Sequence, residues 1–408
     1  MITKLRVSNF YSIGELVELD FIKGGKTEED GYFLCRKGKV STVNGFFGAN
    51  ASGKSTFLRA MYVLVKIIYN KNPLQALGFN ATDKKFFSPN LHSSYKDKIS
   101  HLGFDILLAN KLYKYDVEVI DGSQIQKETL YVMDLNIKSY KDKEVFTRAN
   151  NKIEFGTDYK NHNAFFSVVQ LPDTQTLLSQ LIESFPAGED FRNYKDKFFV
   201  KPDDLNNFMA PPFVEVIQRA LTIDGQEDAK KKKEMVELTS KIMSRFDKTI
   251  KNVKINTENN NINVTVEHEG FYEDVGIMRE SAGTRELFTY IYDIVNVFSK
   301  GGIVLYDETN RYFHPDIENI IISLFKESKI NTSNAQLFFA SHNHDTLNLL
   351  NLDQIFIVEK ENHNSTTYKV SDIKDVKSRD NLKKKYNLGS LGGTPDVIDF
   401  KHTIQQFI

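Results

Sequence analysis

The chain has 408 residues, of which 40% are hydrophobic and 26% charged, as is usual for a globular protein of one large domain or two to three average ones. Its 53 basic and 54 acidic side chains leave a net charge of −1, which excludes an overall basic field for nucleic acid but leaves a local basic face open. The single cysteine, Cys35, excludes an internal disulfide, and no apolar run reaches the 18 residues of a membrane-spanning helix. We therefore expect a cytoplasmic protein without membrane contact.

The first predicted elements lead to a glycine-rich loop. Residues 2–21 alternate apolar and polar side chains and predict two short strands with a turn at residues 9–12. Residues 40–47 are an apolar run typical of a buried strand, and residues 48–55 (Gly-Ala-Asn-Ala-Ser-Gly-Lys-Ser) fit the phosphate-binding pattern G-x-x-x-x-G-K-[ST]. A following helix to about residue 69 is indicated by apolar side chains at helical spacing: Phe57, Leu58, Met61, Leu64, Val65 and Ile68.

That loop predicts binding of a nucleoside triphosphate. Small residues allow its backbone N–H groups to point at phosphate oxygens, and the dipole of the next helix adds to the site. Lys54 is placed to reach the β- and γ-phosphates, and the Ser55 hydroxyl is placed to coordinate Mg²⁺. The residues expected to contact the nucleotide here are Asn50, Ala51, Ser52, Gly53, Lys54, Ser55 and Thr56.

The middle of the chain changes pattern twice. Residues 102–155 hold short alternating runs between polar turns, which predict a meander of antiparallel strands. Residues 164–250 are mostly helical in pattern, with breaks at four prolines, and the lysine run 230–233 is typical of a solvated helix face. We divide the chain into an N-terminal lobe (1–170), a helical insert (171–255) and a C-terminal lobe (256–408).

After residue 280 strands and helices alternate, which predicts a parallel sheet and an α/β fold. The apolar strand 302–306 ends in Asp307 and Glu308, at the edge of the sheet where open α/β proteins bind ligands. Asp307 would hold Mg²⁺, usually through water, and Glu308 would act as general base on the attacking water. The alternative is a pair of solvent-facing acids that open a helix.

Two further motifs flank this acid pair. Strand 337–340 is followed by His342, which can hydrogen-bond the γ-phosphate and report hydrolysis, although His344 competes for that role. Residues 280–285 lie just before a predicted helix, which Ser281 can cap, and Gly283 and the backbone N–H groups at its start make a second anion site. A simple capped helix start is the alternative for Ser281.

The order of phosphate loop, Ser-x-Gly signature, acid pair and switch histidine resembles ABC-type ATPases. Within them the chain is similar to the overcoming-lysogenization-defect and RecF/Rad50 group, and closest to the ATPase subunits of bacterial abortive-infection and phage-defence pairs. The strings that carry this resemblance are residues 5–13, 44–50, 279–285, 341–343 and 386–395. They imply an ABC-type P-loop fold with an antiparallel β lobe and an inserted helical subdomain.

The resemblance also implies a function. ATP would close a homodimer or larger homo-oligomer in which Ser281 and Gly283 of one chain cap the nucleotide of the other. Hydrolysis, with Glu308, His342 and Lys54 as catalytic residues, would reset this switch. The partner would be a separately encoded effector, a nuclease or a toxin, because little chain follows the last predicted strand and no nuclease domain fits there.

Two departures and two alternatives accompany this prediction. Tyr11 stands where the group usually has a basic residue, and Gln170 is only a candidate for the glutamine loop. A DNA-repair or chromosome-type ATPase that acts directly on DNA is the first alternative, and direct nucleic-acid binding stays open. Near-neutral charge and the lack of sustained heptads count against it. A transporter nucleotide subunit is the second, and it is disfavoured by the antiparallel insert and by the signature.

Overall fold

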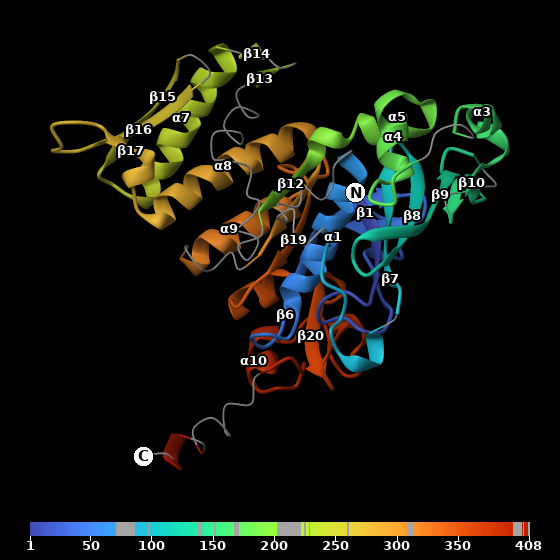
Figure 1. The fold of residues 1–408 in the computed structure, drawn as a ribbon. Helices are drawn as coiled ribbons and strands as arrows, with labels where there is room; N and C mark the ends of the chain where they lie inside the picture. Colours follow the sequence, from blue (N-terminus) through green and yellow to red (C-terminus); the bar gives the residue numbers. More distant parts are fainter. Residues whose placement is uncertain are drawn as a thin grey trace.

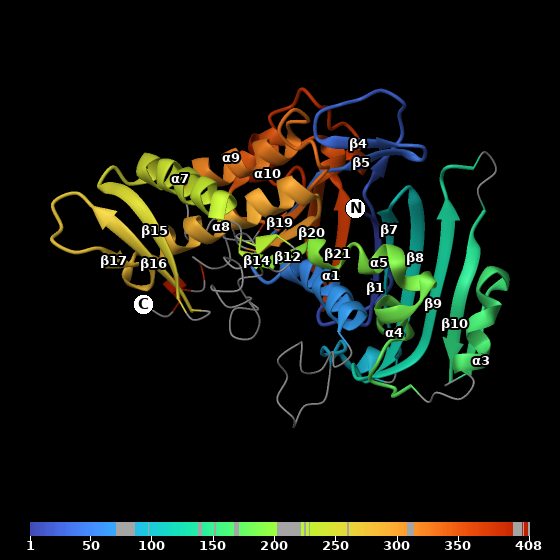
Figure 2. The same cartoon turned by 90° about the horizontal axis from the view of Figure 1, so that it is seen from above.

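The computed structural model describes residues 1–70, 86–96, 98–137, 141–150, 152–166, 171–201, 222–223, 226–227, 229–258, 261–307, 314–394, 402 and 404–406. Two large sheets form the body, with helices between them and outside them, and a small arm stands out from this body (Figures 1 and 2). No helix within these ranges is long and apolar enough to cross a membrane.

The first sheet has seven antiparallel strands in the order β11-β10-β9-β8-β7-β1-β2. Their bounds are β1 Ile2–Ser8, β2 Val17–Asp20, β7 Ser100–Leu108, β8 Lys111–Ile120, β9 Gln124–Asp134, β10 Lys143–Ala149 and β11 Lys152–Phe155. Successive strands from β7 to β11 pair with their neighbours in sequence, which confirms the predicted meander. The N-terminal strand β1 pairs with β7 on one side, with Leu5 opposite Phe104, and with the edge strand β2 on the other.

The second sheet has six strands in the order β12-β18-β19-β6-β20-β21. Its strands are β12 Phe198–Lys201, β18 Ile303–Tyr306, β19 Gln336–Ala340, β6 Val43–Phe47, β20 Ile355–Glu361 and β21 Asn364–Lys369. All neighbours are parallel except β20 and β21, so the predicted parallel sheet and α/β class are confirmed. The strand predicted at residues 40–47 is divided at Thr42, whose hydroxyl donates to the Phe325 carbonyl. Its first half, β5 (Gly38–Ser41), pairs instead with β3 (Ile22–Lys23) and β4 (Tyr32–Cys35).

Both faces of the six-stranded sheet are buried, which explains why its strands are continuous apolar runs. Alternate side chains such as Phe46 and Phe338 belong to the core shared with the antiparallel sheet and with α1 (Lys54–Tyr69) and α4 (Leu177–Ser184). The intervening side chains, such as Phe47 and Phe339, belong to a second core. That core also contains α8 (Ala282–Lys300), α9 (Pro315–Lys326) and α10 (Leu382–Asn387). The sheet thus carries α1 on one face and α8 and α9 on the other (Figure 1).

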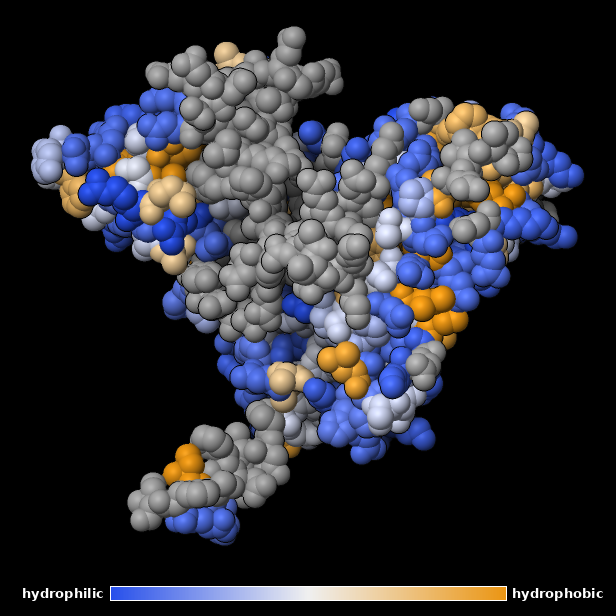
Figure 3. All heavy atoms as spheres, viewed as in Figure 1, coloured by the Kyte–Doolittle hydropathy of each residue, from blue (hydrophilic) through white to orange (hydrophobic). Residues whose placement is uncertain are grey.

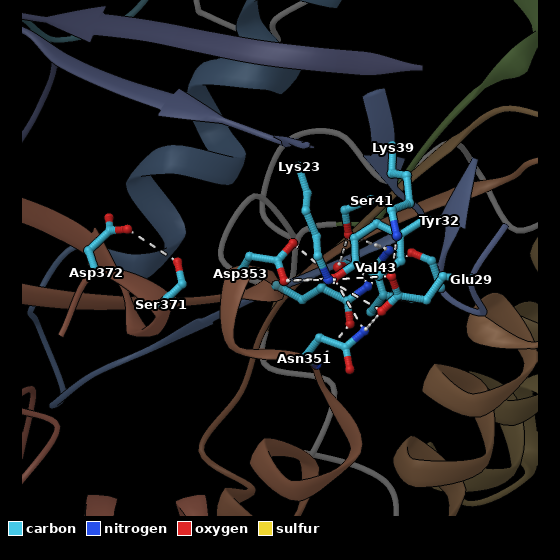
Figure 4. A network of polar contacts seen from close by, with 12 residues as sticks. Lys23, Glu29, Tyr32, Lys39, Ser41, Val43, Asn351, Asp353, Ser371 and Asp372 are labelled. Carbon is cyan, nitrogen blue, oxygen red and sulfur yellow. Dashed lines mark hydrogen bonds and ion pairs between the residues drawn. The ribbon is translucent and has the colours of Figure 1, made fainter. Parts of the chain in front are cut away.

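A polar network fixes the small sheet of β3, β4 and β5 to the segment that precedes β20 (Figure 4). The Tyr32 hydroxyl donates to the Asp353 carboxylate at 2.8 Å and accepts from the Asn351 amide at 3.2 Å. Lys39 is paired with Glu29 at 2.5 Å, and Lys23 lies 4.7 Å from the centroid of the Tyr32 ring. Because β20 is a direct neighbour of β6, these bonds hold one side of the strand that leads into the glycine-rich loop.

The arm consists of α7 (Ala229–Phe246) and a three-stranded sheet of β15 (Ile250–Glu258), β16 (Asn261–His268) and β17 (Val275–Gly276). It joins the body at the start of α8. Lys230 and Lys233 are exposed, as predicted for a solvated helix face. Within the segment predicted to be mostly helical, α4, α5 (Glu189–Arg192) and α7 are helices, whereas β12 is an edge strand. Hydrophobic side chains also show on the arm (Figure 3), where Phe271, Tyr272 and Met278 are exposed.

Candidate nucleotide-binding site

The glycine-rich loop connects the end of β6 to the start of α1. Gly53 precedes the helix with φ of 106°, and a Cβ atom at this position would lie 2.2 Å from the Ser365 hydroxyl. Both the left-handed conformation and the close approach therefore require glycine. Gly53 offers no side chain to cap α1, so the N–H groups of the first turn face the loop without a capping side chain.

Lys54 is the first residue of α1 and is buried. Its ammonium donates to the carbonyls of Gly48 at 2.9 Å and Ala49 at 3.0 Å. These bonds bend the side chain back over the loop. They hold the positive charge close to the backbone of the loop.

Ser55 and Asp307 come together from opposite ends of the chain. The Ser55 hydroxyl donates to the Asp307 carboxylate at 2.9 Å, and Asp307, which directly follows the fully buried strand β18, is only 2% exposed. A hydroxyl and a carboxylate oxygen are the hard ligands that Mg²⁺ accepts, with phosphate and water oxygens completing its shell. The donor set therefore fits the metal expected at these two residues. Glu308 lies outside the described residues, as does Gln170.

His342 follows β19, the neighbour of both β18 and β6. Burial lowers the pKa of His342, and the charges of Lys54 and His344 lower it further, so the imidazole is neutral at pH 7. His344 contacts other residues: its Nδ1 lies 2.7 Å from the Asn387 amide oxygen, within hydrogen-bond distance, and its ring packs against Tyr386. Of the two histidines, His342 is the one that lines the pocket described next.

A pocket of about 620 Å³ lies over the loop. It is lined by Ser12, Asn50, Ala51, Gly53, Lys54, Ser55, Thr56, Arg59 and His342. Of the loop residues expected to contact nucleotide, Ser52 is the exception: it is buried, and its carbonyl accepts from Ser365 at 2.6 Å. Ser12 and Arg59 were not predicted. Arg59 carried a signal in the sequence, because it lies one helical turn beyond Ser55 and hence on the same face of the helix.

Ser281 and Gly283 do not line this pocket. Ser281 is the N-cap of α8, and its hydroxyl accepts from the Thr284 N–H at 3.1 Å. The preceding turn is held by Glu280, whose carboxylate lies 2.9 Å from the His268 ring nitrogen. Ser281 is exposed, so the start of α8 faces solvent. Within one chain, the contacts of Ser281 are those of a helix cap. Its contact to the nucleotide of a second chain stays a prediction.

The C-terminal segment packs behind the loop. The Tyr386 hydroxyl donates to the Gly393 carbonyl at 2.8 Å, and the Gly393 N–H donates to Glu359 at 2.7 Å. A Cβ atom on Gly393 would lie 3.3 Å from the Cα of Gly48, the first residue of the phosphate loop. The string at residues 386–394 thus packs against the first residue of the loop.

Comparison with known proteins agrees with this geometry. The AAA_21 family, described as "AAA domain, putative AbiEii toxin, Type IV TA system", matches residues 43–348. No curated protein is similar enough to count as a match. Among solved structures, an SMC head bound to the C-terminal winged-helix domain of ScpA is 14% identical, with a TM-score of 0.50 over 90% of this chain and 97% of that chain. The Smc head of Pyrococcus yayanosii with a coiled coil and joint is 10% identical, with a TM-score of 0.48 over 95% and 99%. The chain belongs to the AAA_21 family, and its fold is that of the SMC-head, ABC-type P-loop ATPases.

Proposed function

We propose that this chain is an ATP-binding and ATP-hydrolysing switch subunit that dimerises around nucleotide and regulates a separately encoded effector in antiphage defence. The observation that carries the proposal is that Lys54 and Ser55 line one pocket, where the Ser55 hydroxyl is bonded to the buried Asp307 carboxylate behind it. Such a pocket offers a cation, oriented N–H groups and two metal-ligand oxygens to a triphosphate. Membership of an ATPase family supports nucleotide binding.

Each residue has a defined task in this proposal. The N–H groups of the loop and the Lys54 ammonium hold the phosphates, and Ser55 and Asp307 would hold Mg²⁺. When bound, Mg²⁺ supplies positive charge that offsets the charge of the β- and γ-phosphate oxygens. Neutral His342 is able to donate one hydrogen bond to the γ-phosphate. Glu308, next to Asp307 in sequence, is proposed as the base that accepts a proton from the attacking water.

The dimer follows from two incomplete anion sites. The pocket of one chain is open to solvent, and the exposed start of α8 presents Ser281 and the backbone N–H groups of its first turn. Joining two chains would place that helix start over the partner's nucleotide and exclude water. Exposed Met278, three residues before Ser281, offers apolar area beside the proposed contact.

The effector is proposed as a separate protein, a nuclease or a toxin acting with this subunit in the cytoplasm. The description of the family names a toxin and a toxin–antitoxin system, which supports this setting. The similar SMC head was solved with a domain of another protein, ScpA, bound to it, so a fold of this kind is able to receive a partner.

A DNA-acting chromosome-type ATPase remains the second candidate, because a solved structure with a similar fold is an SMC head. The net charge of −1 favours the switch subunit, as does the arm, which among the described residues consists of α7 and three strands and contains no long coiled coil. ATP turnover measured with and without duplex DNA separates the two candidates. The switch subunit is expected to show no DNA stimulation.

The Glu308→Gln variant tests the proposed mechanism. It keeps the shape of the side chain but removes the base, and loss of a general base typically lowers the rate by about 10²–10⁴-fold. We expect the variant to bind ATP, to release little phosphate and to accumulate as a dimer in size-exclusion chromatography with light scattering. Lys54→Ala is the matched control and should neither bind ATP nor dimerise. Near-wild-type turnover by Glu308→Gln would place the base elsewhere.

A further inference from the structure

Arg59 lines the pocket but has no task in the mechanism above. It lies on α1 three residues after Thr56 and four after Ser55, so all three share the helix face that looks into the pocket. The side chain is half-buried, and its Nε is buried without a hydrogen-bond partner. In the part of the chain that the structure describes, no acidic side chain forms an ion pair with it. A guanidinium that is partly removed from water and has no acidic partner in its pocket favours the binding of an anion.

Tyr11 holds this guanidinium in place. The carbon at the centre of the guanidinium lies 4.8 Å from the centroid of the Tyr11 ring, within the range of a cation–π contact. The ring is itself fixed: the Tyr11 N–H donates to the Ser88 carbonyl at 2.9 Å, and the ring meets Phe10 edge to face at 4.8 Å. Because a stacked guanidinium keeps its N–H groups in the plane, they remain free to point at a ligand beside the ring.

The order of strands gives the pocket two different ends. β18 and β19 lie on one side of β6 and carry Asp307 and His342, the groups of the γ-phosphate end. β20 and β21 lie on the other side, where Ser365 of β21 bonds Ser12 at 2.8 Å and Ser12 lies 3.1 Å from the Thr56 hydroxyl. A triphosphate whose γ end lies at Asp307 therefore runs past Lys54 and Thr56 toward this second end.

We propose that Arg59 binds the α-phosphate of the nucleotide at this second end of the pocket, with Tyr11 as the residue that positions it. The inference rests on the proposed function and deepens it, because it assigns the nucleoside side of the pocket. An uncompensated guanidinium favours the charged α-phosphate over the neutral base. The same contact is made by ATP and ADP, since both carry that phosphate.

Calorimetric titration of ATP and of ADP into the Arg59→Gln variant tests the assignment. We expect both affinities to fall by the same factor, about tenfold or more, as for loss of a hydrogen bond to a charged group. Arg59→Lys keeps the charge without the planar fork and should lose less. Tyr11→Leu should also weaken both nucleotides, because the guanidinium is no longer held. Arg36→Gln, at an exposed arginine outside the pocket, is the matched control and should leave both affinities unchanged.

The outcomes separate this inference from the proposed function. If the wild type binds neither nucleotide, the proposed function fails and the assignment of Arg59 fails with it. If Lys54→Ala abolishes binding while a folded Arg59→Gln variant keeps both affinities, only the assignment of Arg59 is wrong. A loss confined to ATP would place Arg59 at the γ-phosphate and overturn the assignment. If Arg59→Gln does not fold, unchanged affinities in Arg59→Lys and Tyr11→Leu together contradict it.

Discussion

The Ser55 hydroxyl and the Asp307 carboxylate are hydrogen-bonded although 252 positions separate them in the chain. The two oxygens proposed as metal ligands are therefore already oriented by the fold alone. The entropic cost of ordering them is met by folding and does not reduce the affinity for the ligand. Lys54 is prepared in the same way, since the carbonyls of the loop hold its ammonium over the site.

His342 gives a prediction for pH dependence. Its pKa is lowered from the usual 6.5, chiefly by burial, so the folded state favours the neutral ring. Between the two pKa values the unfolded chain binds the extra proton. The stability contributed by the neutral ring is thus complete above about pH 6.5 and is lost as the pH falls toward the folded-state pKa. Wild-type protein should lose more unfolding free energy between pH 7.5 and 5.5 than His342→Gln does, as measured by urea denaturation.

His344→Gln is the control and should keep most of the wild-type pH dependence, because this ring lies outside the pocket lining and its charge is a lesser cause than burial of the lowered pKa of His342. If the unfolding free energy of His342→Gln changes with pH as much as that of the wild type, the burial of this ring is not linked to proton binding.

At the scale of elements, Ser281 at the start of α8 is interpreted either as a helix cap or as a contact to the nucleotide of the partner chain. Substitutions at Ser281 separate the two interpretations. Ser281→Ala removes the N-cap and should lower the free energy of unfolding by about 1 kcal/mol. Ser281→Asp keeps a capping oxygen but brings a negative charge toward the partner's phosphates. We expect Ser281→Asp to be as stable as the wild type and to fail in ATP-dependent dimerisation, measured by light scattering. Ser281→Ala should be less stable and still dimerise.

The opposite result would support the interpretation of Ser281 as a helix cap only. If Ser281→Asp dimerises as readily as the wild type, the start of α8 does not meet a nucleotide, and Ser281 acts only within its own chain.

Elements with local signals were predictable from the sequence, and those decided by distant partners were not. The phosphate loop and α1 were predicted because glycine positions and helical spacing lie within one short segment. The break at Thr42 was missed, since it depends on the Phe325 carbonyl of a helix far along the chain. β12 was missed because a short apolar run does not tell a strand from a helix. Arg59 was missed because its place in the site depends on packing against Tyr11.

At the scale of the whole molecule, one buried side chain joins the two large sheets. The Gln336 amide at the start of β19 accepts from the Ile2 N–H at 2.8 Å and donates to the Ile2 and Ser41 carbonyls at 2.8 and 2.9 Å. It therefore ties the antiparallel sheet to the parallel sheet that carries the pocket.

Gln336→Leu should destabilise the protein strongly. Each buried backbone group that loses its partner costs about 1–3 kcal/mol, and this change leaves three of them unpaired. The measurement is the free energy of unfolding in urea, followed by circular dichroism. Gln124→Leu, at an exposed position of β9, is the control and should change stability by less than about 0.5 kcal/mol. Equal stability of the two variants would mean that the sheets are held together without this amide.

The central position of β6 also has a consequence for biosynthesis. Its two neighbours, β19 and β20, are made about 290 residues later or more, which at about 5–20 residues per second is a delay of roughly 15–60 s on the ribosome. The strands β7 to β11 pair with near neighbours and are free to form during that interval, whereas β6 has unpaired edges until β19 and β20 have been made. The strands beside the phosphate loop are therefore added late, and until then nucleotide has no complete pocket with which to stabilise the nascent chain.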